Sequence, residues 1–235
     1  MKATMSPLYL VGLLLLGLVC GIHAEDDVCG DTDQATYRPC PTVGLPCVRN
    51  YLQVRSACQS FSDEDRDSFV GSPVDLYAAN FNLSAVQTNI LTEGFSNARL
   101  FEFTVNLEKD LIVLTVEYTN LTLKNHYDYS YFQPSEEPIT FQEYSTERYP
   151  HLYITSYISG VNNPQWASAY HVHYQEGTVE MSYERECVDE NDGVLDAVLK
   201  DVRANIDIVT REVFLYRNQQ IQEFFVKRNL CNFLQ

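Results

Sequence analysis

Apolar and polar side chains alternate with a period of two through the middle of the chain. The alternation starts near Val74, is clearest over residues 101–123, and returns over residues 152–159, 170–174 and 179–184. This period predicts β-strands that bury one face. The positions expected to share the apolar faces are Phe101, Phe103, Val105, Leu107, Ile112, Leu114, Val116, Tyr118, Leu121, Leu123, Leu152, Ile154, Ile158, Tyr170, Val172, Tyr174, Val179, Met181 and Tyr183.

Short polar connections between these segments favour antiparallel pairing. Leu107-Glu-Lys-Asp110 separates the first two clear strands and predicts a hairpin turn. His171 and His173 alternate with the apolar positions of their strand, so they are expected to face solvent. The whole stretch therefore predicts a long antiparallel meander with one face in water.

Helical spacing occurs at both ends of this meander. Pro46 followed by Val48, Tyr51 and Leu52 predicts a short helix that ends near Cys58. After Gly193 the apolar residues recur at every third or fourth position to Phe225 without proline or glycine, which predicts one helix of about 30 residues and roughly 45 Å. Because the chain offers no partner helix of similar length, we expect an α+β fold in which a curved antiparallel β-sheet wraps around one long C-terminal α-helix.

Residues 1–24 have the pattern of a secretory signal peptide. Lys2 supplies the basic start, residues 11–20 form the apolar core, and Ala24 is the small residue at the cleavage site. Charged or amide side chains interrupt every later apolar run, so we expect no membrane span. We therefore expect an exported, soluble protein with a single domain over residues 25–235, since no repeat, low-complexity tract or Gly/Ser linker divides the chain.

Six cysteines remain after the signal peptide is removed. An even number in an oxidising compartment predicts three disulfides. Cys40 and Cys47 are predicted to pair, because Gly44 and two prolines fold the segment between them. The pairing of the other four is left open by counting alone: Cys29, Cys58, Cys187 and Cys231. No two cysteines have the spacing of a zinc ligand pair, so no metal site is predicted.

The chain is strongly acidic. Its net charge is −16, and removal of the signal peptide leaves 15 basic and 32 acidic residues, or −17. Such a charge excludes nucleic acid and anionic membrane surfaces as expected partners, because both attract cations. Two sequons, Asn82-Leu-Ser84 and Asn120-Leu-Thr122, are N-glycan acceptors in an exported chain, and both lie on predicted strands.

Three short sequence patterns resemble catalytic or metal-binding motifs. Gly94-Phe-Ser96-Asn-Ala98 has the spacing of a nucleophile elbow, but such an elbow needs a strand-turn-helix corner, and this one lies between antiparallel strands. His171 and His173 share a strand face without a third ligand at useful spacing. Residues 63–74 begin like a calcium loop, with acids at every second position, but Ser68 and Val74 occupy the glycine and glutamate positions. The sequence therefore predicts neither an enzyme nor a cofactor.

Several residue blocks carry a resemblance to a known family. The cysteine pair at 40 and 47, Leu91-Thr-Glu-Gly-Phe-Ser-Asn97 and the late helical stretch resemble the insect takeout and juvenile-hormone-binding family. Within it, Arg38-Pro-Cys40, the ten-residue step from Cys47-Val-Arg49 to Cys58 and the ending Asn229-Leu-Cys231-Asn-Phe233 are similar to the fibrohexamerins, the silk glycoproteins of moths. The resemblance spans most of residues 38–233.

The resemblance implies a fold and a function. A long helix embraced by a curved sheet is the fold of the wider family, in agreement with the periodicity. A fibrohexamerin-like protein is expected to be a structural silk protein, which associates noncovalently with the heavy and light chains of fibroin and aids their secretion. The alternative is a secreted carrier of a small hydrophobic ligand, such as a juvenile-hormone-like terpenoid or a lipid, held between sheet and helix. A filled core and a ligand cavity have the same apolar pattern.

Overall fold

The computed structural model describes residues 35–56, 58, 67–186, 193–215 and 217–231. Residues Tyr37–Gln235 form one compact unit, and Met1–Thr36 form a separate one. The predicted signal peptide, Cys29 and Cys187 lie outside the described residues. Among the described helices, none has both the length and the apolarity needed to span a bilayer.

Strands dominate the unit. The elements are the strands β1 (Thr36–Tyr37), β2 (Ser68–Val70), β3 (Val74–Ala78), β4 (Leu83–Glu93), β5 (Arg99–Asn106), β6 (Leu111–Tyr131), β7 (Ile139–Ser159), β8 (Tyr170–Glu176) and β9 (Glu180–Glu186), the helices α2 (Leu45–Arg55), α3 (Gly193–Ala204), α4 (Ile206–Phe214) and α5 (Asn218–Asn229), and the 3-10 turns η1 (Ala79–Phe81), η2 (Phe95–Asn97) and η3 (Trp166–Ser168).

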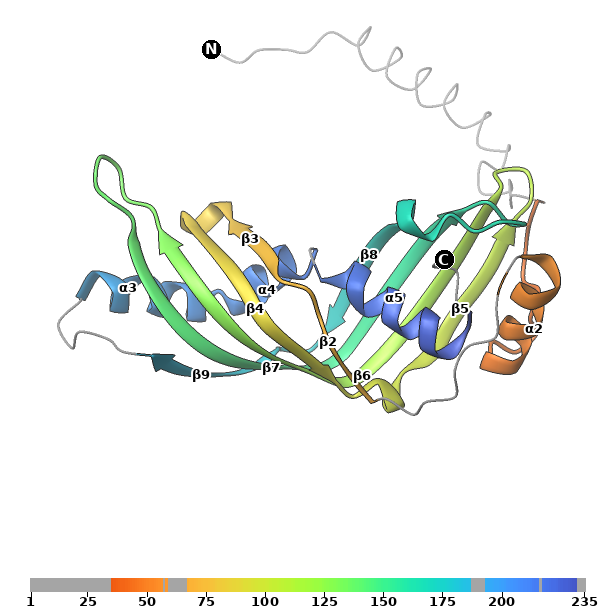
Figure 1. Cartoon of the computed structure of the whole chain (residues 1–235), viewed down its shortest axis with the longest axis horizontal. Helices are drawn as coiled ribbons and strands as arrows, with labels where there is room; N and C mark the ends of the chain where they lie inside the picture. Colours follow the sequence, from red (N-terminus) through yellow and green to blue (C-terminus); the bar gives the residue numbers. More distant parts are fainter. Residues whose placement is uncertain (1–34, 57, 59–66, 187–192, 216, 232–235) are drawn as a thin grey trace, which may run out of the picture. The chain divides into compact units, whose positions relative to one another are not determined.

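Two strands of 21 residues each form the spine of the sheet. β6 and β7 pair antiparallel from Leu111↔Ser159 to Tyr131↔Ile139. β5 pairs the first part of β6 and β8 pairs the second part of β7, so these four form one half, here named the β5–β8 half. β4 pairs the second part of β6, β3 pairs β4, and β9 pairs the first part of β7; these form the β3–β9 half (Figure 1).

The two halves meet where the pleat of both long strands shifts. Asn120 adopts a left-handed φ of 55°, and the regular pairing is interrupted between Thr119↔His151 and Leu121↔Tyr149. Pro150 lies in this gap, and proline has no N–H to offer a strand ladder. As a result Tyr118 and Leu121, three residues apart, both face the core.

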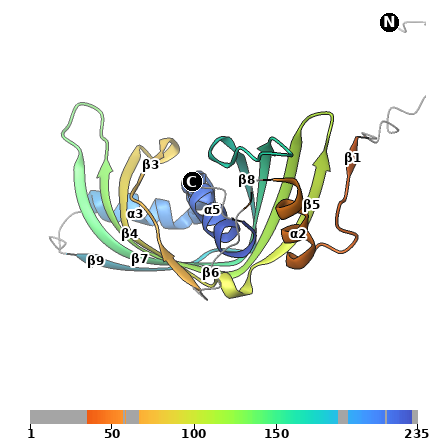
Figure 2. The same cartoon turned by 45° about the vertical axis from the view of Figure 1, so that its right-hand side comes forward.

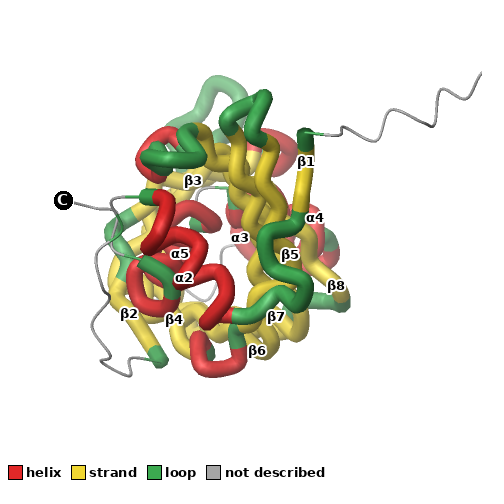
Figure 3. Tube along the Cα trace, turned by 90° about the vertical axis from the view of Figure 1, so that its right-hand side faces the viewer, coloured by secondary structure: helices red, strands yellow, loops and turns green. Residues whose placement is uncertain are grey.

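The sheet is curved, and the C-terminal helices lie on its concave side. α5 lies inside the curve, between the strands of both walls (Figures 2 and 3). Its buried side chains Ile221, Phe225 and Val226 join a continuous apolar core with the inner face of the β5–β8 half. α2 begins after extended Gly44 with Pro46 in its first turn, and it buries Val48 and Leu52 in the same core. The predicted curved sheet and N-terminal helix are confirmed.

The prediction of one long C-terminal helix is wrong. The chain forms α3, α4 and α5, with a turn at Asn205 and a second break after Phe214. A straight rod of 45 Å touches a curved surface over only part of its length, whereas three short helices can each pack on their own stretch of sheet. The apolar stripe determines which face of each helix packs on the sheet, and the curvature of the sheet determines where the helices end.

Three assignments of strand faces are also wrong. Leu107 is 55% exposed because it lies in the turn after β5 and not on the strand. Phe101 is 56% exposed because the register of β5 on β6 shifts between Leu100 and Glu102. In β8 the buried side chains are His171 and Gln175, whereas Tyr170 and Tyr174 are 66% and 64% exposed. A period of two defines two faces but does not say which one is covered. The faces predicted for Phe103, Val105, Ile112, Leu114 and Val116 are confirmed.

Candidate functional site

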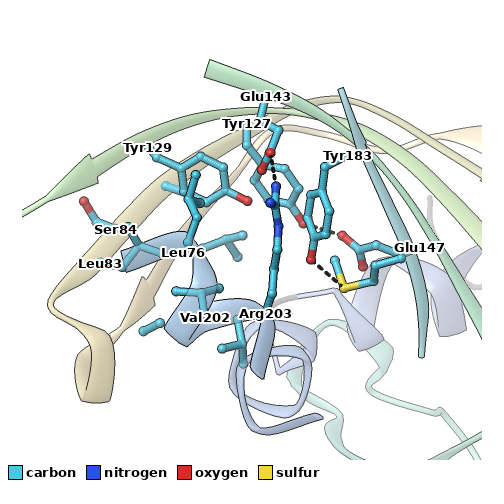
Figure 4. A pocket seen from close by; sticks show the side chains of 15 residues that line it. Leu76, Leu83, Ser84, Tyr127, Tyr129, Glu143, Glu147, Tyr183, Val202 and Arg203 are labelled. Atoms are coloured by element: carbon cyan, nitrogen blue, oxygen red, sulfur yellow. Dashed lines mark hydrogen bonds and ion pairs between the residues drawn. The ribbon is translucent and has the colours of Figure 1, made fainter. Parts of the chain in front are cut away.

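An apolar pocket lies between α3, α4 and the inner face of the β3–β9 half. Its space of about 600 Å³ includes a part that is open to solvent. Its walls are mainly apolar and aromatic: Leu76, Ala78, Leu83, Ala85, Tyr127, Tyr129, Met181, Leu199, Val202 and Val209. Ser84, Glu143, Glu147, Tyr183 and Arg203 add polar groups (Figure 4). An apolar cleft with a few converging polar groups is the general form of a small-molecule site.

Stacked rings from the two long strands form one wall of this pocket. The ring of Tyr129 lies 5.0 Å from that of Tyr127 and 4.6 Å from that of Phe141, and both pairs are nearly parallel. These rings come from successive inner positions of β6 and from the facing position of β7. Such pairs add to the stability that area burial provides.

A half-exposed cation reaches into the pocket from α3. Arg203 donates from Nη2 to Oε1 of Glu143 at 2.8 Å, and its guanidinium lies 4.4 Å from the ring centre of Tyr183 (Figure 4). Glu143 is almost fully buried, whereas 41% of the Arg203 side chain is exposed. The ion pair therefore extends from a buried carboxylate in the pocket wall to a guanidinium that is partly exposed to solvent.

Beside the pocket lies a buried ion pair. Arg217, between α4 and α5, donates from Nη1 to Oε2 of Glu147 at 2.5 Å and from Nη2 to Oε1 at 3.2 Å. Both side chains are at most 2% exposed. Arg217 also donates from Nε to Oε1 of Gln87 at 2.8 Å and from Nη2 to the hydroxyl of Tyr127. One arginine thus joins the helical segment to β4, β6 and β7.

Further donors surround the carboxylate of Glu147. The hydroxyls of Tyr127 and Tyr149 donate to its two oxygens at 2.5 and 2.8 Å, and Nδ2 of Asn125 donates at 3.1 Å. Burial by itself would raise the pKa of Glu147, but the charge of Arg217 and these hydrogen bonds outweigh it and hold that pKa below its usual range. Burial raises the pKa of Tyr127 and of Tyr149. All the charges in this network are paired.

The two histidines of β8 lie on the inner face, in the apolar half. His171 Nδ1 is 2.9 Å from Oγ of Ser156, and its ring packs edge-on against Trp166. The ring of His173 lies 5.0 Å from that of Phe214. Burial lowers the pKa of His171 to about 4 and also lowers that of His173. Within the described part of the chain, no three His, Cys, Asp or Glu residues gather as metal ligands would.

Two disulfides join cysteines near the ends of α2 and α5. Cys40 is bonded to Cys47 with a Cα–Cα distance of 5.9 Å, at the start of α2. Cys58 is bonded to Cys231 with a Cα–Cα distance of 5.4 Å, which ties the segment after α2 to the end of α5. Arg49 also donates from Nε to the carbonyl oxygen of Asn229 at 2.5 Å. The pairing of Cys58 was beyond the reach of cysteine counting.

Both sequon asparagines are exposed and in the left-handed region. Asn82 has a φ of 48° and ends the turn η1, directly before β4 rather than within it. Asn120 lies at the pleat shift of β6, where its Oδ1 accepts from Nη2 of Arg148 at 2.9 Å. Asparagine adopts this backbone region more readily than other residues with a side chain. Both sites can therefore carry a glycan without displacing a packed side chain.

The Gly94-to-Ala98 pattern has no catalytic setting. It forms the turn η2 between β4 and β5, which pair antiparallel with successive stretches of β6, and the backbone N–H of Ser96 donates to Asp67 at 2.5 Å. Gly94 has a φ of 103°, and a Cβ there would lie 3.0 Å from the carbonyl oxygen of Asn120. The glycine is needed for this close approach of the turn to β6. Asp63 and Asp65 lie outside the described residues.

Sequence reasoning missed the network around Arg217. Residues 139–149 form the first part of β7, but their inner positions include the polar Glu143, Ser145 and Glu147, so no apolar alternation was visible. The signal that could have found this strand is polar residues at both odd and even positions of a strand-length stretch that lies between two clear strands. Such a strand must place its polar inner residues against polar partners.

Comparison with known proteins places the chain in a family. The family model described as Fibroin P25 matches residues 36–234. The Fibrohexamerin of Galleria mellonella is 23% identical over 197 residues, which cover 83% of this chain and 88% of that protein. The crystal structure of Epiphyas postvittana Takeout 1 superposes with a TM-score of 0.49 at 14% identity, covering 79% of this chain and 91% of that one. The resemblance to the fibrohexamerins is confirmed, and because the family model spans nearly the whole described part, this chain belongs to the Fibroin P25 family.

Proposed function

We propose that this protein is a secreted, N-glycosylated accessory subunit of a silk fibroin complex. In this role it binds the fibroin heavy and light chains without a covalent bond and keeps them soluble during assembly and secretion. The observation that carries the proposal is the match to the Fibroin P25 family over residues 36–234, together with the similarity to a Fibrohexamerin. The single domain over residues 25–235 and the signal peptide of residues 1–24 belong to the same proposal.

The cysteine chemistry supports noncovalent binding. Cys40, Cys47, Cys58 and Cys231 are bonded within the chain, so none of these four has a thiol for a partner. The acidic charge supports a solubilising role, since a subunit of net charge −16 repels further copies of its own complex. A fibrous partner with unpaired strand edges is prone to edge-to-edge aggregation, which such a subunit would oppose.

The test is isolation of the complex from silk glands. We expect this protein to elute with the fibroin chains on size exclusion under native conditions. We expect urea without reductant to release it, because noncovalent contacts alone hold it. Elution as a free monomer, with fibroin exported normally from glands that lack the protein, would contradict the proposal.

The role of the glycans can be separated from the role of the fold. Gln at position 82 or 120 would combine loss of the sugar with strain in the left-handed region. Ser84→Ala and Thr122→Val remove the sequons and leave both asparagines in place. We expect the double variant to reduce secretion or the solubility of the complex while changing stability by less than about 0.5 kcal/mol. The control is Thr146→Val, on the outer face of β7 and outside any sequon.

A second candidate function is transport of a small apolar molecule. The pocket beneath α3 and α4 supports it, because its walls are mainly apolar and a few polar groups converge on it, as in small-molecule sites. If the protein were a carrier, a terpenoid or lipid would copurify in stoichiometric amount or bind at micromolar or lower concentration, which corresponds to about 8 kcal/mol. We expect extraction and mass spectrometry of the native protein to find none. A stoichiometric ligand would favour the carrier function.

A further inference from the structure

The outer, convex face of the β5–β8 half carries an exposed aromatic surface. Phe101, Tyr157, Tyr170 and Tyr174 are 56%, 38%, 66% and 64% exposed. Tyr153 joins them, with its ring 5.3 Å from Phe101 and 6.0 Å from Tyr174. We refer to these five residues as the aromatic face. Large exposed apolar side chains that gather on one face mark interaction sites rather than ordinary surface.

The strand register makes this face regular. Tyr174 lies opposite Tyr153, Val172 opposite Thr155, and Tyr170 opposite Tyr157. On the next strand Thr115 Oγ1 lies 2.8 Å from Thr155 Oγ1, which fills the middle of the face without a charge. The rings therefore stand in two cross-strand rows separated by small side chains. A paired sheet holds them in place, so little side-chain entropy is lost when a partner binds.

Few charges lie on this face. Arg99 and Glu117 form an ion pair at its margin, and Tyr153 donates to Glu117 at 3.2 Å. Glu102 lies on β5 opposite Thr115, and Glu176 lies at the end of β8. In a protein of net charge −16, the paired outer positions of β7 and β8 carry only one acid, the terminal Glu176. It therefore matches a partner surface that carries little charge.

The outer face of the β3–β9 half, by contrast, carries many charged side chains. Its cross-strand positions carry Glu93, Lys124, Asp128, Arg148, Glu180 and Glu184. Asn120, at the junction of the halves, is bonded to Arg148 on this side, and Asn82 lies before β4. Both glycan acceptors thus lie outside the aromatic face, which sugars would otherwise cover.

We propose that the aromatic face is the surface that binds fibroin, through extended, weakly charged segments of the fibroin chains laid across β7 and β8. This inference rests on the proposed function and assigns its contact surface. A second copy of this chain fits less well, because two convex sheets touch over a small area, short of the ~800 Å² per partner that stable interfaces bury. Two acidic copies also repel each other. An extended chain can follow the curve, with the rings packing on its side chains and the tyrosine hydroxyls bonding to its backbone.

The test compares variants of the two outer faces. Fibroin heavy- and light-chain complex is purified from silk glands and stripped of the native subunit in urea without reductant. Refolded complex is then titrated with recombinant full-length protein. We expect Tyr170→Ser/Tyr174→Ser to weaken binding at least about tenfold, as loss of central aromatic anchors does. Tyr77→Ser/Tyr144→Ser, which removes two exposed tyrosines of the β3–β9 half, should leave binding within about twofold.

A second variant guards against misfolding. Val172→Lys introduces one charge at the half-exposed middle of the face and should weaken binding in the same way, with an unchanged urea midpoint. Wild-type binding by both variants of the aromatic face would overturn the surface assignment and leave the proposed function standing. Absence of binding by the wild-type protein would overturn the proposed function itself. A wild-type dimer in sedimentation that Tyr170→Ser/Tyr174→Ser dissociates would assign the face to self-association instead.

Discussion

The two halves of the sheet share the same two long strands, yet they are built for opposite surroundings. Beneath α5 the inner face of the β5–β8 half is apolar, with Phe103, Leu114, Leu152 and Ile154 at most 2% exposed. Beneath α3 and α4 the β3–β9 half has a partly open pocket, the Arg203–Glu143 pair and the Arg217–Glu147 network. The outer faces differ in the same sense: the first half is aromatic outside, and the second is charged.

The difference indicates that the two halves have different roles. The apolar half is filled by a helix and closed by two disulfides, so its inner face is committed to stability. Its outer face is then free to present aromatic rings. The other half uses buried charges where the helical segment breaks, because the side chain of Arg217 needs the break to reach β4, β6 and β7.

The largest effect is expected from Arg217→Met. The change leaves the Glu147 carboxylate buried with its charge partner removed, and such a break costs about 3–5 kcal/mol. Urea unfolding followed by circular dichroism measures it. Arg148→Met is the control, because its pair with Glu180 at 3.4 Å is exposed and should contribute less than about 1 kcal/mol. Equal losses would mean that the network adds nothing beyond a surface pair.

A matched pair of leucines compares the packing of the two halves. Leu152 is fully buried beneath α5, and Leu83 lines the pocket at 4% exposure. Leu→Ala changes in cores cost about 2–5 kcal/mol, and the cost rises with the cavity left behind. We expect Leu152→Ala near the upper end and Leu83→Ala near the lower, since the pocket already deprives Leu83 of some neighbours. A larger loss at Leu83 would show that the pocket half is the better packed.

The smallest expected effect is a pH dependence from the buried histidine of the apolar half. The folded state holds the pKa of His171 at about 4, below the ordinary value of 6.5. Between these values the unfolded chain binds a proton that the folded protein does not, so stability falls as the pH is lowered from about 6.5 towards 4. His171→Gln, which is neutral throughout, should flatten this decline in urea midpoints. Identical slopes in both proteins would show that His171 does not contribute.

Glu147 acts in a lower pH range. Its folded pKa is depressed, so its contribution is present above the usual carboxyl pKa of 4.5 and is lost as the pH falls through the lower, folded value. During acidification the destabilisation due to His171 should therefore appear first, and the loss of the Glu147 contribution second. The same urea series, extended below pH 4.5, records the second loss.

Much of the fold could be predicted from local patterns. Ile112, Leu114 and Val116 were placed on one buried face, and the turn at residues 107–110 was placed between the right strands, because each depends on neighbours a few residues away. The first part of β7 was missed because its inner positions are polar. The pocket was missed as well, since an apolar pattern does not distinguish a filled core from a cleft.

The sequence by itself determined the period of each segment, the short helix α2, the acidic charge and the residue blocks that identify the family. Only the tertiary structure decided which face of β8 is covered, where the C-terminal stripe breaks into three helices, and which carboxylate receives Arg217. The physical reason is the separation along the chain of the residues that interact. Periodicity and turns depend on residues close in sequence, whereas burial, curvature and the Arg217–Glu147 pair, 70 residues apart, depend on how the long strands bend around the helices.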